Sequence, residues 1–403
     1  MTDDVPASSR SSFLVLLPLW LMVLAASSQV MVVAPVLPRI EAELGIPEAR
    51  LGFIVSGYAT ALSAFALVAG PVSDRVGRRR IILAGTGIMT VALGLHAFAA
   101  DFWSLLLIRM TAGAAGGVLT GSAVSYVGDY FPYEKRGWAS GWVMSGFAVG
   151  QILGVPAGAM LADRYGFKAP FLLFCVVMAF AFVMAFVFMP QPDVARSKSV
   201  GVGASLARYR SLLRRRSVAF AALAYATMFF AVSNFVVYFP KWAEETRGLS
   251  ADQIASLFMV GGVASVVFGP RAGKVSDRFG RKPMIIASCW GTTILFAVTP
   301  WMVVGPITAY VMFFIAMVLL AMRLSPFQAL LTALSSSDER GTLMSLVVAV
   351  GQLGGGIGAA VAGTVYSSYG YVGCTSLAAL SITFTGLFVL RGLPEPPRND
   401  AQG

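Results

Sequence analysis

The sequence predicts an all-α polytopic membrane protein with 12 transmembrane helices in two pseudo-symmetric six-helix bundles. The chain of 403 residues is 57% hydrophobic and only 12% charged, a balance that would cover a water-soluble domain with apolar surface. Apolar runs recur along the whole chain, and about 20 mainly apolar residues suffice for one membrane-spanning helix. A motif after the second run returns 203 residues later, which indicates two homologous halves.

Apolar runs between charged or Pro/Gly-rich breaks define the expected spans. In the first half, residues 13–189, they cover 13–37, 50–72, 81–99, 104–127, 138–161 and 169–189. In the second half, residues 218–391, they cover 218–240, 252–272, 283–303, 306–331, 342–364 and 372–391. The first run looks like a secretory signal peptide, but it is longer than the apolar core of a signal. We therefore interpret it as the first span.

The segments outside the two bundles are two short tails, residues 1–12 and 392–403, and a connection, residues 190–217. Most of the 30 lysines and arginines fall on the side of the bilayer that holds these three segments. The other side holds six of them: Arg39, Arg50, Arg164, Lys168, Lys241 and Arg247. The positive-inside bias therefore predicts a multi-pass protein of the cytoplasmic membrane with both termini in the cytoplasm.

The connection between the halves carries alternating apolar and basic residues. Leu206, Tyr209, Leu212 and Leu213 alternate with arginines. This spacing is typical of a short amphipathic helix that lies on the headgroups of the bilayer. A solvated basic linker explains the composition equally well, and both interpretations stay open.

Composition and motifs also exclude other classes of protein. The net charge of +11 could suggest a nucleic-acid partner, but the basic residues are spread over short loops rather than gathered on one water-facing patch. The three cysteines, Cys175, Cys289 and Cys374, are far apart and inside apolar runs, so neither a metal site nor a disulfide scaffold is indicated. We find no nucleophile with a base and no phosphate-binding loop, and therefore expect neither an enzyme nor a cofactor.

The repeated motif is the most specific signal in the chain. Residues 70–80, GPVSDRVGRRR, return at 273–282 as GKVSDRFGRK. The motif, its repeat and the number of spans together resemble the major facilitator superfamily (MFS) of secondary transporters, over the whole chain. The resemblance implies an MFS fold with gates on the cytoplasmic side. The gating residues would be Asp74, Arg75, Gly77, Arg78, Asp129, Asp277, Arg278, Gly280 and Arg281.

The two gates are not equivalent in sequence. In the family, the arginine of the motif pairs with an acidic residue at the end of the fourth span, and Asp129 occupies that place. Asp74, Arg78 and Asp129 would then latch the cytoplasmic side in the outward-facing state. Ala333 stands at the corresponding place in the second half. We therefore expect the second latch to be weaker, or to borrow Asp338.

Arg109 lies in the fourth span, with glycines following at four-residue steps. It resembles the arginine motif that the family links to proton coupling, but a snorkelling arginine near the end of its span is an equal alternative. His96, near the end of the third span, is interpreted as a passive interfacial residue. All 19 acidic residues lie in tails, loops or near span ends, so an interior coupling carboxylate is missing. The coupling candidates are Arg109, Asp129 and His96.

Glycine stripes on the fifth and eleventh spans predict close helix packing. They consist of Gly146, Gly150, Gly154 and Gly158, with Pro156 between, and of Gly351, Gly355 and Gly363. Residues 154–158, GVPAG, resemble the antiporter motif of twelve-span exporters of drugs, sugars and nucleosides, with the proline one place later than usual.

Polar residues within the spans define the candidate substrate site. They are Gln29, Tyr126, Asn234, Arg323 and Gln328. Arg323 is the most informative of them, because a guanidinium inside a bilayer costs at least ~2.5–3.5 kcal/mol on insertion scales. It requires a counter-charge or a substrate, unless it snorkels toward the cytoplasmic end. Gln29 and Asn234 could equally serve as hydrogen-bonding groups between helices.

We therefore expect an MFS transporter, most simply a monomeric, proton-coupled exporter of drugs or metabolites, with a small-molecule substrate, the lipid bilayer and protons as its partners. One alternative is an organic-anion transporter or uniporter with Arg323 as the anion site. Another, from a different class, is a non-transporting receptor or scaffold, but such a protein would not need two gate motifs.

Overall fold

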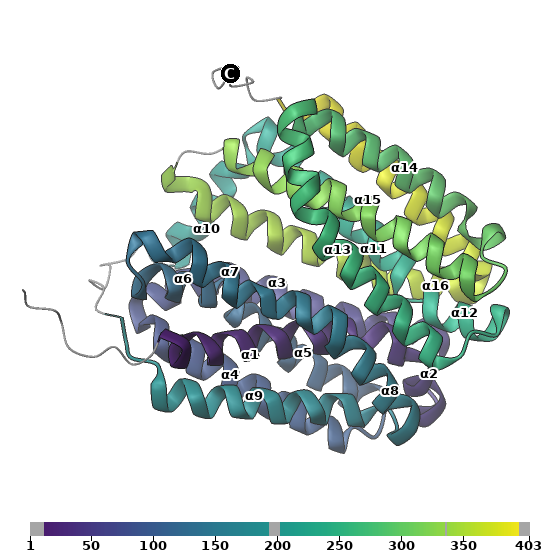
Figure 1. The fold of residues 1–403 in the computed structure, drawn as a ribbon, viewed down its shortest axis with the longest axis horizontal. Helices are drawn as coiled ribbons and strands as arrows, with labels where there is room; N and C mark the ends of the chain where they lie inside the picture. The colour runs from purple at the N-terminus through teal and green to yellow at the C-terminus, as the bar shows by residue number, and fades with distance from the viewer. Residues whose placement is uncertain (1–11, 193–201, 335–336, 395–403) are drawn as a thin grey trace, which may run out of the picture.

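The chain folds as two helical bundles joined by a short helix (Figure 1). The structure, a computed structural model, describes residues 12–192, 202–334 and 337–394. The helices of the first half are α1 (Ser12–Met31), α2 (Val33–Leu44), α3 (Glu48–Val76), α4 (Arg78–Leu95), η1 (His96–Phe98), α5 (Phe102–Leu119), α6 (Ser122–Tyr130), α7 (Tyr133–Val149), η2 (Gly150–Gly154), α8 (Val155–Tyr165) and α9 (Lys168–Phe188). The connecting helix α10 (Val202–Leu213) leads to α11 (Arg216–Val236), α12 (Phe239–Arg247), α13 (Ala251–Phe279), α14 (Arg281–Met302), α15 (Pro306–Ala333) and α16 (Ser337–Gly392).

The number of spans agrees with the prediction once α16 is divided. Within the described residues, 11 helical segments are long and apolar enough to cross a membrane. One of them, Gly341–Gly392, has 52 residues, far more than the roughly 20 that one crossing needs. Its helical geometry breaks at Gly370, where φ is 63° and ψ is −165°. Residues 341–392 therefore supply the eleventh and twelfth spans, and the protein is a multi-pass membrane protein.

Prolines break the first span of each half at equivalent places. Pro35 lies four residues after Met31, where α1 ends, and Pro240 lies four residues after Val236, where α11 ends. A proline has no N–H to donate to the carbonyl four residues earlier, and its ring collides with that carbonyl. Each span therefore continues as a separate short helix, α2 or α12, beyond the break.

The fifth span contains a widened turn where two predicted features meet. Residues Gly150–Gly154 form a single π-helical stretch between α7 and α8. Pro156 follows directly, in the first turn of α8. Because a proline displaces the carbonyl four residues before it, the helix relaxes into the wider π turn here.

The two halves meet along α3 with α16 and along α13 with α8. In Figure 1 the first half, purple to teal, lies below the second, green to yellow. We call the end that holds α10 and the two motif loops the linker end, and the end that holds α2 and α12 the far end. The closest glycine contacts between the halves fall near the far end, on the first dozen residues of α3 and α13: a Cβ at Gly52 would lie 1.9 Å from the Ala359 carbonyl oxygen, and one at Gly262 2.9 Å from Ile152.

The connection between the halves contains a helix that packs on the protein. Tyr209 and Leu212 on α10 are buried, and the Tyr209 hydroxyl donates to the Leu67 carbonyl on α3 over 3.2 Å. Arg215 forms a bidentate contact of 2.6 and 2.8 Å with Glu339 at the start of α16. These contacts turn the apolar side of α10 toward both halves, whereas Leu213 remains exposed.

Candidate functional site

The first motif loop is a sharp turn with an ion pair behind it. Gly77 has a φ of 106°, in the region that favours glycine, and separates α3 from α4. Arg78, the first residue of α4, donates from Nε to Asp129 Oδ2 over 2.7 Å and from Nη1 to Ser73 Oγ over 3.0 Å. The predicted partner Asp129 thus lies where the sequence placed it, near the end of α6. Asp74 lies on α3, but its side chain is outside the described part of the structure.

The second motif loop repeats the turn with a different partner for the arginine. Gly280 has a φ of 98°. Arg281 donates from Nη1 to the Ala329 carbonyl oxygen over 3.2 Å and lies 3.5 Å from Asp277, whose side chain is 64% exposed. The motif arginine of the second half thus donates to a backbone carbonyl, whereas the motif arginine of the first half donates to an aspartate. The side chains of Ala333 and Asp338 lie outside the described part of the structure, so a role for Asp338 stays a prediction.

Two further basic residues hold the last helix of each half against its motif loop. Arg79 donates from Nε to the Met189 carbonyl oxygen and from Nη2 to the Phe186 carbonyl oxygen, each over 2.6 Å. Lys282, 203 residues later, donates to the Leu393 carbonyl oxygen over 2.8 Å. Both side chains thus satisfy unpaired carbonyls at a helix C-terminus. The repeat in the sequence carries this signal, although neither position is among the predicted gating residues. Of those, Arg75 and Arg278 are exposed on their helices.

Arg109 is the centre of a buried polar cluster in the first half. Its side chain is 1% exposed, so it does not snorkel to water. Nη1 donates to Gln29 Oε1 over 2.7 Å, and the Gln29 amide donates to the Tyr58 hydroxyl over 3.1 Å. The guanidinium carbon lies 4.5 Å from the centre of the Tyr58 ring and 5.7 Å from that of Phe171. Aromatic faces and an amide surround the charge, an arrangement that partly replaces a counter-ion.

His96 is buried beside this cluster, contrary to the interfacial interpretation. Its side chain is fully buried, and its ring stacks on Phe171 with centroids 3.9 Å apart. Nδ1 lies 2.9 Å from the Ala92 carbonyl oxygen, and Nε2 has no hydrogen-bond partner within the described residues. His96 begins the turn η1 at the end of α4, and its ring packs against α9. Hydropathy alone does not predict this contact.

Arg323 is buried in the second half against the neighbouring helix α14. Its side chain is 1% exposed, and Nη1 donates to Thr292 Oγ1 over 3.4 Å. Cys289, one turn before Thr292, also contacts the guanidinium. In this conformation the side chain is closed to solvent, so a solute could reach it only after the helices move.

The other predicted substrate residues have different surroundings. The Tyr126 hydroxyl donates to the Pro190 carbonyl oxygen over 2.6 Å, and the Asn234 amide bridges to the Gly358 carbonyl oxygen over 3.1 Å. Both side chains are buried, and Asn234 is a hydrogen-bonding link between α11 and α16. Gln328 is exposed and lies against Tyr225 on α11.

The glycine stripes lie at close contacts between helices. On the fifth span, a Cβ at Gly146 would lie 2.6 Å from the Trp20 carbonyl oxygen, and one at Gly154 2.1 Å from Ser28 Oγ. Gly150 and Gly158 also face α1 and the residue that follows it, and Pro156 is buried. On α16, Gly351 and Gly355 face α11, whereas Gly363 faces Ala49 on α3. The stripes therefore bring the fifth span against the first and the eleventh against the seventh and second.

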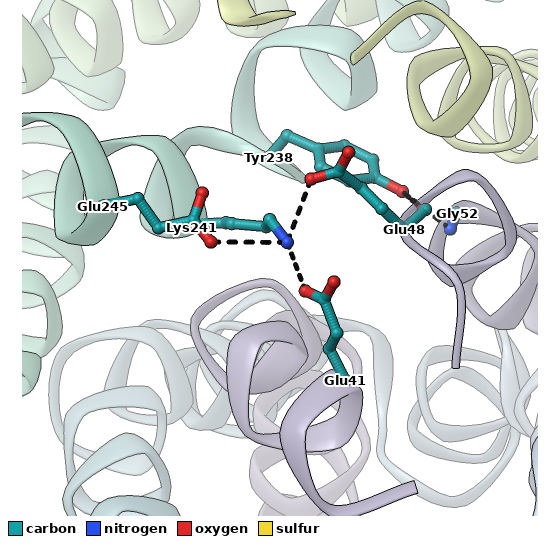
Figure 2. Close-up of polar contacts among 6 residues, drawn as sticks. All are labelled: Glu41, Glu48, Gly52, Tyr238, Lys241 and Glu245. Carbon is teal, nitrogen blue, oxygen red and sulfur yellow. Dashed lines mark hydrogen bonds and ion pairs between the residues drawn. The ribbon is translucent and has the colours of Figure 1, made fainter. Parts of the chain in front are cut away.

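An ion-pair cluster joins the two halves at the far end (Figure 2). Lys241 on α12 contacts Glu41 on α2, Glu48 on α3 at 2.9 Å, and Glu245 on its own helix at 3.4 Å. The Tyr238 hydroxyl donates to the Glu48 carbonyl oxygen over 2.9 Å and accepts from the Gly52 N–H over 3.1 Å. Lys241, Glu41 and Glu48 are not among the predicted site residues, because in the sequence each resembles an ordinary charge near the end of a span.

Comparisons with known proteins agree with this architecture. A family model described as Major Facilitator Superfamily matches residues 19–322 and 221–403. The chain is 26% identical over 407 residues to the "Multidrug resistance protein MdtG" of Salmonella dublin, covering 96% of each chain.

Two solved structures share the fold. A D-xylose-proton symporter superposes with a TM-score of 0.74 at 18% identity, covering 95% of this chain and 98% of that one. A bacterial homolog of the human lysosomal transporter Spinster, in an inward-facing and unoccupied conformation, gives 0.73 at 17% identity, covering 97% and 100%. With two six-span halves, a duplicated motif loop and a family match that covers both halves, this protein is a membrane transporter that belongs to the Major Facilitator Superfamily.

Proposed function

We propose that the protein exports small organic molecules from the cell in exchange for protons, as a monomer that works by alternating access. The relative named a multidrug resistance protein supports a drug-like substrate, because the similarity extends over 96% of both chains. The glycine stripe with Pro156 on the fifth span supports an exporter, since it resembles the antiporter motif. Both termini and α10 would then lie in the cytoplasm, in agreement with the positive-inside bias.

The single observation that best supports alternating access is the position of the contacts between the halves. The close contacts of Gly52 and Gly262 with the other half lie on the first dozen residues of α3 and α13, and ion pairs join α2 with α12 at the same end. This is the arrangement expected when the route to the substrate is closed at the far end and faces the linker end. With the termini in the cytoplasm, the conformation is inward-facing.

The motif loops would close the linker end in the opposite conformation. The Arg78–Asp129 pair of 2.7 Å lies within the first half, so it can persist while the halves move. In the outward-facing state, Asp74 on α3 would approach the start of α16, where helix N–H groups favour a carboxylate. Arg75 would assist Asp74 in the first half, and the equivalent residues Asp277, Arg278 and Arg281 would act in the same way in the second half.

For coupling, the candidates are Asp129, His96 and Arg109. Asp129 is the only carboxylate among them, and its 2.7 Å contact with Arg78 makes its charge part of the gate. Gln29, Tyr126, Asn234, Arg323 and Gln328 form the proposed substrate set. Gln328 is the exposed member and would meet the substrate first.

Transport in proteoliposomes tests this proposal. The probe is ethidium, a permanent organic cation, and the pH gradient and membrane voltage are set separately with buffers and valinomycin. We expect ethidium flux that reverses with the pH gradient at zero voltage. Flux that ignores the pH gradient would overturn proton exchange, and absence of ethidium flux under every gradient would overturn the drug-like substrate class.

A second candidate is the export of organic anions, and the surroundings of Arg323 favour it. The side chain is buried, it contacts a hydroxyl and a thiol, and its Nε has no hydrogen-bond partner within the described residues. An anion that leaves the cell gains ~2.3 kcal/mol per charge per 100 mV, so it needs no coupling carboxylate. Carboxyfluorescein flux that follows voltage alone would favour this candidate over proton exchange.

A further inference from the structure

The far-end cluster around Lys241 contains more negative than positive charge. One ammonium group, 5% exposed, contacts Glu41 and Glu48 of the first half and Glu245 of its own helix. Figure 2 shows the ammonium between the three carboxylates. Because Lys241 and Glu245 share α12, only the contacts with Glu41 and Glu48 break when the halves separate.

The energetic consequence depends on the ionisation of the two first-half glutamates. While they are charged, moving Lys241 away from Glu41 and from a 2.9 Å contact with Glu48 removes two attractions in a partly buried place. Once both are protonated, Lys241 and Glu245 attract one another equally in either conformation. Closure of the far end therefore gains electrostatic free energy only when Glu41 and Glu48 are ionised.

Among the groups around the cluster, only a second ion pair between the halves adds to this balance. Tyr238, directly before α12, and Tyr366 and Cys374 on α16 interact with the glutamates and are neutral at ordinary pH. A neighbouring cluster has Arg39 of α2 at 2.5 Å from Asp163 of α8 and 3.4 Å from Glu244 of α12. It also carries excess negative charge, and its inter-half contact is the longer one.

An uncharged clamp lies beside the ion pairs and supplies an internal control. The Tyr238 hydroxyl bonds to both the Glu48 carbonyl oxygen and the Gly52 N–H of α3. These two hydrogen bonds hold the same helices together without a titrating group. Loss of this clamp should weaken closure at every pH.

We propose that Lys241, Glu41 and Glu48 form a proton-sensitive latch that holds the far end closed and that opens when the outside becomes acidic. This inference rests on the proposed alternating access. Protons bind the two glutamates when the far end is open and must leave before Lys241 can return. The latch therefore carries no proton across the membrane; it sets the ratio of the two conformations according to external pH. By linkage, that ratio changes by up to about tenfold per pH unit for each glutamate.

The experiment measures the distance across the far end, without any substrate. Ala42 on α2 and Thr246 on α12 are exposed residues of opposite halves. Both are replaced by cysteine, in full-length protein whose three native cysteines are replaced by serine, and carry spin labels in lipid nanodiscs. Pulsed electron paramagnetic resonance gives the short and long distance populations between about pH 8 and pH 4. We expect the long population to grow as the pH falls.

Three variants separate the latch from other causes. Glu41→Gln with Glu48→Gln should raise the long population at pH 8 and reduce its dependence on pH, leaving only the contribution of the Arg39–Glu244 contact. Tyr238→Phe should raise it at every pH and leave the pH response intact, and Glu245→Gln should also keep that response. Size-exclusion profiles and melting temperatures establish that each variant is folded. An unchanged pH response in the double glutamine variant would overturn the latch.

The outcome is separable from that of the proposed function. If ethidium flux is absent but the distances respond to pH as expected, the substrate class fails and the latch stands. If flux is normal and the wild-type distances do not change with pH, the latch fails and the exporter stands.

Discussion

Arg109 donates a 2.7 Å hydrogen bond to Gln29 in the buried centre of the first half. The amide of Gln29 in turn donates to Tyr58, so one side chain positions both partners. Replacing Gln29 with Leu should destabilise the protein by roughly 1–3 kcal/mol, because Arg109 then loses its acceptor in a buried place. Thermal unfolding in detergent measures the change.

The matched variant is Tyr58→Phe, which keeps the ring against Arg109 and removes only a neutral hydrogen bond. Its cost should be smaller, about 0.5–1.5 kcal/mol. A melting temperature lowered equally by both substitutions would contradict the central role of Gln29.

The two motif loops should differ in their tolerance of substitution. Asp74→Asn should reduce transport on the order of tenfold or more with normal insertion, because it removes a partner of the cytoplasmic latch and leaves the positive charges intact. Asp277→Asn should be milder, because Arg281 already contacts the Ala329 carbonyl oxygen and Asp277 is 64% exposed. Flux curves of the two variants at equal protein levels test this difference. An equal loss of flux would show that the replacement of an aspartate by Ala333 in the second half does not affect gating.

Gly52 should be intolerant of any side chain. An added Cβ would lie 1.9 Å from the Ala359 carbonyl oxygen, so Gly52→Ala must push α3 away from α16 at a cost of about 1–3 kcal/mol. Gly128→Ala on α6 is the control, because its Cβ would meet nothing within 4 Å and alanine favours the helix by roughly 0.5–1 kcal/mol. Melting temperatures should move in opposite directions, and a neutral Gly52→Ala would argue against this close contact.

Arg323 decides between the two proposed substrate classes. If it binds an anion, Arg323→Lys should weaken binding of carboxyfluorescein, because the planar guanidinium is lost while the charge remains. Arg323→Ala should weaken it further and leave protein yield unchanged or improved, because a buried charge is removed. A structural arginine gives the reverse pattern, a nearly silent Lys variant and an Ala variant with a lower melting temperature and unchanged selectivity. Affinities for carboxyfluorescein and ethidium, with melting temperatures, distinguish the two.

The sequence by itself determined the fold class, the six-span plan of each half and the motif loops. Apolar length and the distribution of basic residues are local properties of the chain, and a membrane leaves few other ways to satisfy the backbone. The pairing of Arg78 with Asp129 was also predictable, because the family motif specifies both residues. The breaks at Pro35 and Pro240 also follow from local chemistry, because proline lacks an N–H and its ring collides with the carbonyl four residues earlier.

Only the tertiary structure decided which polar groups meet. The sequence predicted Arg109 as a coupling candidate and Gln29 as a substrate-site candidate, without a link between them. Their 2.7 Å contact depends on how α1 and α5 are rotated about their axes. Lys241 was one of several basic residues at the far end until the packing of α12 against α2 and α3 surrounded it with Glu41 and Glu48. Such contacts join residues 80 and about 200 positions apart. Hydropathy and spacing fix each helix, but the rotation and depth of one helix against another come from side-chain packing over the whole bundle.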